Sequence, residues 1–243
     1  MRNDWQSFFY LLGMGIVFLH LQCAEAKLSE DDFKFMRQNM IETQIKARGI
    51  QDERVLRAFE AVERHEFVPV DLRKYAYGDH PLAIGFDQTI SQPYIVALMT
   101  EALQLEVGDK VLEVGTGSGY QAAVLAQIVE NVYTIEIVEG LYQSATELLN
   151  QLGYHNIRTR LGDGWKGWPE ESPFDKIIVT AAPDEIPQAL LDQLRDGGRM
   201  VIPVGAQGAV QNLLIGVKEN ESFKTISEVP VRFVPLVRGH KEG

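Results

Sequence analysis

A glycine-rich stretch, Glu113–Gln121, has the residue types and spacing of a ligand-binding turn. It follows the apolar run 111–114 and leads into the apolar run 122–126, which predicts a strand-to-helix junction. Glycines accept positive φ and let a ligand approach the backbone, while the unpaired N–H groups at the start of the helix face that ligand. The residues of this turn expected to hold a ligand are Gly115, Thr116, Gly117 and Gly119.

Two acidic residues accompany the turn. Glu113 lies two residues before the first glycine, and Glu136 ends the next apolar run, about 20 residues further on, where such folds bind ribose hydroxyls. A dinucleotide site would need glycine where Tyr120 stands. The spacing G-x-G-x-G instead resembles the S-adenosylmethionine site of class I methyltransferases. A purely structural turn is disfavoured because three glycines cost conformational entropy.

A third polar group, Asp163-Gly164, follows the apolar run 156–161. An Asp here can accept a hydrogen bond from an adenine amino group, although an ordinary Asp-Gly turn explains the pair equally well on its own. Its spacing from Glu113 and Glu136 favours the cofactor role. After the next apolar run, Thr180–Pro183 lacks the acid or amide, paired prolines and aromatic residue of methyltransferases that act on bases, which weakens a nucleic-acid target.

An alternating series of strands and helices must position these residues. Apolar periodicity predicts strands at 110–114, 132–136, 156–161, 174–180 and 199–203 and helices at 120–129, 139–152 and 184–194. Such alternation predicts an α/β fold with a doubly wound, mostly parallel, Rossmann-like sheet that binds ligands at the carboxyl ends of its strands. The runs 213–217 and 224–237 have no helix between them and predict an antiparallel edge.

Helices are also predicted before this core. Ser29 and the acids after it start one helix, Asp52 caps a second, and Pro93 begins a third. The segment 71–90 lacks sustained periodicity and is predicted to be a loop-rich connector that forms a lid or substrate wall. The expected organisation is a segment 1–26, N-terminal helices and a substrate loop at 27–106, and a cofactor-binding core at 107–243, with 27–243 as one compact unit.

The first 26 residues have the form of a secretory signal, with Arg2, an apolar run 8–21 and the small-x-small sequence Ala24-Glu25-Ala26. The run is short for a spanning helix, so no permanent membrane span is expected. A periplasmic or secreted protein is predicted if this segment works as a signal; a cytoplasmic protein is the alternative. Cys23, the single cysteine, precedes the predicted cut, so the mature chain would lack disulfides and thiolate nucleophiles.

The charge balance bears on partners. The chain of 243 residues has 34 acidic and 23 basic residues and a net charge of -11, and it stays acidic without residues 1–26. Because nucleic-acid affinity rests mainly on clustered Lys and Arg, which the sequence lacks, no nucleic-acid partner is expected. We expect a monomer.

Six short motifs then carry a resemblance. Over about residues 33–240, in order and at the same spacings, the chain resembles the protein-L-isoaspartate O-methyltransferase family. The resemblance implies an enzyme of protein repair, which uses S-adenosylmethionine and no metal to esterify the free α-carboxyl of L-isoaspartyl residues in damaged proteins and peptides. A small-molecule methyltransferase and a non-catalytic binder of damaged chains are the alternatives. The motifs are Gln88–Pro93, Glu113–Gln121, Gly162–Trp165, Ile178–Pro183, Pro203–Gly205 and Val231–Leu236.

The resemblance also assigns roles. Taken alone, Ser91 is better explained as the N-cap of the helix from Pro93, but the resemblance makes it the catalytic residue, whose hydroxyl binds the substrate carboxylate. It implies that Thr89 and Ile90 contact the cofactor, and that Pro203 and Val204 contact the substrate.

A catalytic base is not needed, because the acceptor carboxylate is already ionised at neutral pH and the enzyme has mainly to align the reactants. The side chains expected to lie outside the chemistry are His65, His80, His155 and His240, as surface or loop residues, and Trp165 and Trp168, which pack a loop.

Overall fold

The structure is a computed structural model that describes residues 28–239. The predicted signal 1–26, with Cys23, and His240 lie outside the described residues. Within residues 28–239, none of the helices combines the length and apolarity needed to cross a membrane.

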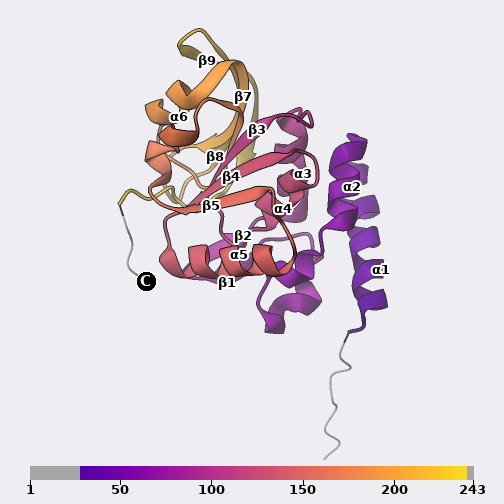
Figure 1. The fold of residues 1–243 in the computed structure, drawn as a ribbon. Coiled ribbons are helices and arrows are strands. Elements are labelled where there is room, and N and C mark those ends of the chain that lie inside the picture. Colours follow the sequence, from indigo (N-terminus) through magenta and orange to yellow (C-terminus); the bar gives the residue numbers. More distant parts are fainter. Residues whose placement is uncertain (1–27, 240–243) are drawn as a thin grey trace, which may run out of the picture.

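A seven-stranded sheet forms the centre of the fold, with the order β5-β4-β3-β6-β7-β8-β9 (Figure 1). Strands β3 to β7 are parallel, whereas β8 is antiparallel to both of its neighbours. This confirms the predicted mostly parallel sheet with an antiparallel edge. The strands are β3 (Lys110–Val114), β4 (Asn131–Glu136), β5 (Ile157–Leu161), β6 (Phe174–Val179), β7 (Leu194–Val204), β8 (Gln211–Glu219) and β9 (Ser222–Val231).

Two apolar layers cover the sheet, because successive strand residues point to opposite faces. On one face, Val111 and Val132 pack in a cluster with buried residues of α1 to α4. On the other face, Leu112 and Ile135 pack in a cluster with Leu190 of α6. Figure 1 shows α6 and the α1–α2 pair on opposite sides of the molecule. The core helices are α4 (Tyr120–Ala126), α5 (Glu139–Gln151) and α6 (Gln188–Gln193).

The N-terminal helices share a core with the sheet. Ser29 and Asp32 form a capping box at the start of α1 (Glu30–Met40), and α3 (Pro93–Ala102) begins with its proline. Beyond α1 the coil continues as a π-helix and a 3₁₀ turn to Gly49, which has φ 94. Asp52 caps α2 (Glu53–Ala61). Buried residues of α1, α2 and α3 belong to the same cluster as Val111, so both predicted segments contribute to one core.

The segment 71–90 differs from the predicted connector, because it contains an antiparallel hairpin of β1 (Leu82–Gly85) and β2 (Gln88–Ile90). Strands of four and three residues are too short to show a period of two in the sequence. At the tip, Phe86 and Asp87 adopt φ 52 and 57. The Phe86 ring lies against Gly140 of α5, where an added Cβ would stand 2.3 Å from Cζ.

Three boundaries also differ from the sequence prediction. Helix α6 starts only after Pro187, not at 184, and β7 begins at Leu194, well before the predicted 199. Strand β9 ends at Val231, and the chain then crosses the carboxyl end of the sheet. There Ala182 N donates to Val234 O, and Leu236 N donates to Ala182 O, both at 2.8 Å. The residues after β9 therefore border the strand ends.

The prediction for His65 was wrong. Its side chain is buried, with 1% exposed, in the 3₁₀ turn Arg64–Phe67. The ring stacks on Phe33 with centroids 4.0 Å apart, and Nδ1 lies 2.8 Å from Tyr77 Oη. Its carboxylate neighbours are Glu66, 3.4 Å from Nε2, Glu30 and Glu63, and Glu63 already binds Arg37 at 3.0 Å. The aromatic partners are distant in sequence, so local pattern could not reveal this burial. His80 and His155 are exposed, as expected.

Candidate active site

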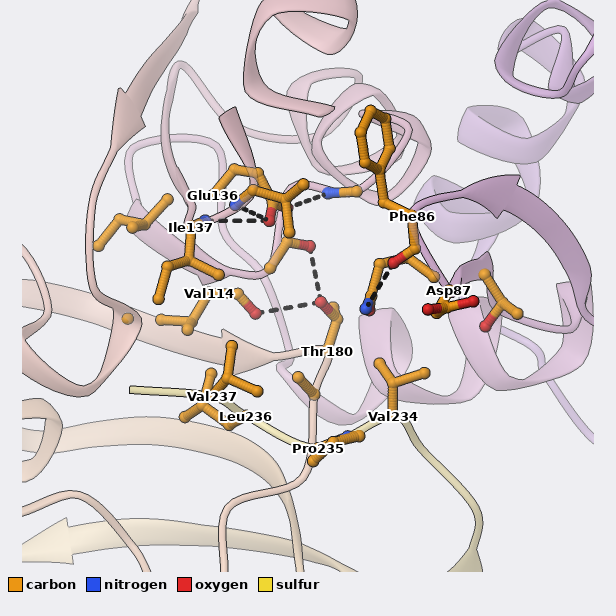
Figure 2. Close-up of a pocket in the computed structure, with 18 residues that line it drawn as sticks. Phe86, Asp87, Val114, Glu136, Ile137, Thr180, Val234, Pro235, Leu236 and Val237 are labelled. Atoms are coloured by element: carbon orange, nitrogen blue, oxygen red, sulfur yellow. Dashed lines mark hydrogen bonds between the residues drawn. The ribbon is translucent and has the colours of Figure 1, made fainter. Parts of the chain in front are cut away.

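A cavity of about 260 Å³ lies at the carboxyl ends of β3, β4 and β6 (Figure 2). The strand order reverses here, since β4 lies on one side of β3 and β6 on the other. Doubly wound sheets bind ligands at such a reversal. We call this space the strand-end cavity. Its lining includes the hairpin residues Phe86–Thr89, the strand-end residues Val114, Gly115, Gly117, Glu136, Ile137, Val138, Gly164 and Thr180, and the segment Val234–Val237.

The glycine-rich turn closes against Thr180, which follows β6. The Thr180 hydroxyl donates to Val114 O at 3.0 Å and to Gly115 O at 2.7 Å (Figure 2). Gly115 has φ 102, and a Cβ there would lie 2.4 Å from Thr180 Oγ1. Glycine is therefore required at this position by conformation and by close approach.

Glu136 is held rigidly at the edge of the cavity. Its Oε2 accepts a hydrogen bond from Gly117 N at 2.8 Å, and its Oε1 accepts from Ile137 N and Val138 N, each at 2.9 Å. A carboxylate offers roughly four acceptor positions, so capacity for a further donor remains. The arrangement presents a fixed negative charge that could bind a hydroxyl group of a ligand.

Glu113, predicted to bind the cofactor, lies beneath the turn and does not line the cavity. Its Oε2 accepts from Thr134 Oγ1 at 2.5 Å, while Oε1 has no hydrogen-bond partner within residues 28–239. Burial, opposed by the hydrogen bond from Thr134 and aided by the nearby Glu136, raises the pKa of Glu113 to about 8. Thr116 is also turned this way, with its Oγ1 2.7 Å from that of Thr134.

The other predicted cofactor residues separate into two groups. Gly164 lines the strand-end cavity, and a Cβ there would lie 2.4 Å from Val114 Cγ1. Asp163 does not line it: Oδ1 caps Trp165 N at 3.0 Å and Oδ2 accepts from Gly239 N at 3.3 Å. Ile90 is buried, and Gly119 is the N-cap of α4; neither lines the strand-end cavity.

A second cavity of about 410 Å³ contains Ser91, and we call it the Ser91 cavity. Thr89, Thr180 and Val234 line both cavities and so form a shared wall. Among the described residues that line the Ser91 cavity, Arg232 is the one charged side chain, and it is exposed.

Pro203 and Val204, the predicted substrate contacts, line neither cavity. Both lie in β7, where they pair with Leu213 and Asn212 of β8. Both residues therefore belong to the pairing of β7 with the antiparallel edge of the sheet and lie outside the two cavities.

Sequence reasoning did not assign several lining residues, chiefly Phe86, Ile137, Thr180 and Val234–Val237. Thr180 and Val234 do fall inside the motifs Ile178–Pro183 and Val231–Leu236, which was the available signal. The tryptophans pack as expected. Trp165 Nε1 donates to Leu236 O at 3.1 Å, and Trp168 contacts the Tyr133 ring edge-on at 5.5 Å.

The sheet order, the G-x-G-x-G turn and the acid at the end of β4 define the class I methyltransferase fold. A family model described as protein-L-isoaspartate(D-aspartate) O-methyltransferase matches residues 35–241. The chain belongs to this family.

Curated relatives support the family assignment over most of the chain. The protein-L-isoaspartate O-methyltransferase 1 of Nitrosospira multiformis is 54% identical over 216 residues, which is 88% of this chain and 92% of the relative. The protein-L-isoaspartate O-methyltransferase of Opitutus terrae is 52% identical over 202 residues, 83% of this chain and 87% of the relative.

Two solved structures of protein-L-isoaspartate O-methyltransferases have a fold similar to that of this chain. A protein-L-isoaspartate O-methyltransferase superimposes with a TM-score of 0.72 at 30% identity and covers 82% of this chain, which spans 65% of that protein. One from Plasmodium falciparum, in complex with S-adenosyl-L-homocysteine, gives a TM-score of 0.70 at 26% identity and covers 85% of this chain and 99% of that one.

Proposed function

We propose that the protein transfers a methyl group from S-adenosyl-L-methionine to the free α-carboxylate of L-isoaspartyl residues in damaged proteins and peptides. The observation that carries this proposal is the shared wall of Thr89, Thr180 and Val234 between the strand-end cavity and the Ser91 cavity. Two ligands bound in adjoining cavities can meet at such a wall. Membership of the family supplies the identity of the two ligands.

The residues of the strand-end cavity fit the methyl donor. Gly115 and Gly117 leave room beside the backbone, Glu136 offers acceptor oxygens for ribose hydroxyls, and Ile137 and Val138 add apolar surface. These residues would hold the adenosyl group. When bound, S-adenosyl-L-methionine supplies an electrophilic methyl group on a positively charged sulfur.

The Ser91 cavity suits a carboxylate acceptor. The Ser91 hydroxyl can donate a hydrogen bond to it, and the Arg232 guanidinium supplies positive charge at the exposed side. Because a carboxylate with a pKa of about 4 is ionised at neutral pH, no side chain has to remove a proton. The remaining work of the chain is to align the acceptor and to exclude water, which is where proximity effects operate.

The decisive experiment incubates the full chain with labelled S-adenosyl-L-methionine and an isoaspartyl peptide, and measures alkali-labile methyl ester. The matched control is the same peptide with a normal aspartate. We expect ester only on the isoaspartyl peptide. Methylation of a small molecule in place of both peptides, or tight S-adenosyl-L-homocysteine binding without any turnover, would contradict the proposal.

We further propose that residues 1–26 are a cleaved signal and that residues 27–243 act outside the cytoplasm as a monomeric, single folding unit. The signal-like pattern and the core shared by the N-terminal helices and the sheet support this. Mass spectrometry of the N-terminus from fractionated cells tests cleavage, light scattering after gel filtration tests the monomer, and one cooperative unfolding transition tests the single unit. An intact N-terminus in the cytoplasmic fraction would favour the cytoplasmic alternative.

A further inference from the structure

Arg64 is a buried cation behind the Ser91 cavity. It lies in the 3₁₀ turn Arg64–Phe67, its side chain is 0% exposed, and it is among the largest fully buried side chains of residues 28–239. Burial lowers the pKa of Arg64 to about 10, so the guanidinium is still charged at neutral pH. No carboxylate is among its hydrogen-bond partners within residues 28–239. Backbone carbonyl groups and an aromatic ring, described next, therefore compensate the charge.

One edge of the guanidinium joins two loops. Nε donates to Ala76 O at 2.7 Å, and Nη2 donates to Ser91 O at 2.7 Å. These two nitrogens present parallel donors with fixed spacing, because the guanidinium is planar. Arg64 therefore fixes the position of the Ser91 carbonyl with respect to Ala76, which caps the 3₁₀ helix Val70–Tyr75.

The face of the same guanidinium contacts the glycine-rich turn. Arg64 Cζ stands 4.8 Å from the centroid of the Tyr120 ring, a cation–π arrangement. Tyr120 is the first residue of α4, directly after Gly119, and its ring is fixed edge-on by Phe67 with centroids 5.5 Å apart. Arg64 therefore connects the loop that carries Ser91 to the turn that lines the strand-end cavity.

Stability alone is a poor explanation for this arrangement. Removing a cation from water is costly, and even buried ion pairs can often be replaced by apolar residues of similar volume without loss of stability. Arg64 Nη1 also lacks a hydrogen-bond partner within residues 28–239. What an apolar side chain cannot supply is a pair of directional bonds to the backbone of two loops.

We propose that Arg64 is a positioning residue, which fixes the Ser91 loop against the glycine-rich turn so that the Ser91 hydroxyl meets the acceptor carboxylate at the methyl donor. This inference rests on the proposed function, since it assigns Ser91 the role given there. Arg64 acts through Ser91 and contacts neither ligand.

A double-mutant cycle tests the proposal on the full chain. We expect Arg64→Met to lower kcat/KM for an isoaspartyl peptide by about 10-fold, no more than the loss of the Ser91 hydroxyl itself, while the Kd for S-adenosyl-L-homocysteine changes by less than about threefold. If Arg64 acts through Ser91, then Ser91→Ala added to Arg64→Met should cost less than about a third of what it costs alone. Losses that multiply in full, or an equal loss of S-adenosyl-L-homocysteine affinity, would overturn the proposal.

Two further variants keep the test decisive. Arg64→Lys retains the charge but cannot present two parallel donors, so it should show the same non-additivity if Arg64→Met fails to fold. Arg199→Met is the matched control, because Arg199 also donates to a backbone carbonyl, that of Ala102, remote from both cavities. A wild-type protein that does not esterify the peptide would defeat the proposed function, whereas an additive cycle in an active protein defeats only the role of Arg64.

Discussion

The two cavities are built in different ways. The strand-end cavity gathers short stretches that directly follow β3, β4 and β6, and backbone hydrogen bonds of 2.8 to 2.9 Å fix its carboxylate, Glu136. Both cavities take further lining from segments far apart in sequence, but the charged side chain of the Ser91 cavity, Arg232, is exposed. A rigid site suits a ligand that never varies, whereas an open site suits peptides whose neighbouring residues differ. The contrast predicts separable effects on the two ligands.

The largest effect is expected at the rigid site. Glu136→Ala removes the proposed acceptor for ribose hydroxyls and frees three backbone N–H groups, so the Kd for S-adenosyl-L-homocysteine should rise about 100-fold. Isothermal titration calorimetry measures this directly. Glu136→Gln, which keeps one oxygen acceptor, should lose less. An unchanged Kd with reduced turnover would break the contrast between the cavities.

Ser91→Ala should act on the other ligand. Removal of one hydrogen bond to a charged carboxylate is expected to lower kcat/KM for an isoaspartyl peptide about 10- to 30-fold, with the Kd for S-adenosyl-L-homocysteine within about twofold of wild type. Ser144→Ala on α5, where the hydroxyl binds Gly140 O, is the control and should leave both quantities unchanged. A parallel loss of cofactor affinity would argue against the assigned role of Ser91.

A smaller effect is expected for Arg232→Gln. Because Arg232 is exposed, its attraction for a carboxylate is screened, and KM for the peptide should rise only about threefold at low salt and return towards wild type at high salt. Lys224→Gln, on β9 and paired with Glu219, is the control. If the change in KM were independent of salt, a packing role would replace the electrostatic one.

The last prediction concerns Glu113 and the stability of the fold, not the affinity for either ligand. In the folded protein the pKa of Glu113 is about 8, raised by burial from its ordinary value of 4.5. Between these values the folded state keeps a proton that the unfolded state loses, so the free energy of unfolding decreases as pH rises and levels off above pH 8. Glu113→Gln should remove this component. Between about pH 5.5 and 8.5 the midpoint temperature of thermal unfolding should therefore fall more steeply in the wild type than in Glu113→Gln. Parallel curves for the two proteins would contradict the raised pKa of Glu113.

The part of the site that sequence predicted is the local part. Gly115, Gly117 and Glu136 directly follow or end apolar runs that are recognisable as strands in the sequence. Their spacing was therefore enough to predict that they lie at the carboxyl edge of the sheet. Glu113 was predicted to bind the cofactor but does not line the cavity, because adjacent strand residues face opposite sides and its neighbour Val114 lies on the cavity side. Similarity to a family identifies a motif, but the alternation of side chains along the strand determines which residues of that motif face the cavity.

The distant parts could not be predicted in the same way. The β1–β2 hairpin has too few residues to show a period, and its Phe86 reaches the cavity only because Gly140 leaves room for the ring. Asp163 caps a turn in place of facing the cavity, an outcome that its Asp-Gly context left open. Packing between remote segments determined these positions.

The segment Val234–Val237 has a consequence for how the protein becomes active. It follows the nine strands found within residues 28–239, yet it lines the strand-end cavity and is bonded to Ala182 by two hydrogen bonds of 2.8 Å. A chain that stops after Val231 should thus form its sheet and still bind the methyl donor poorly, because the wall of the cavity depends on a segment that follows the sheet.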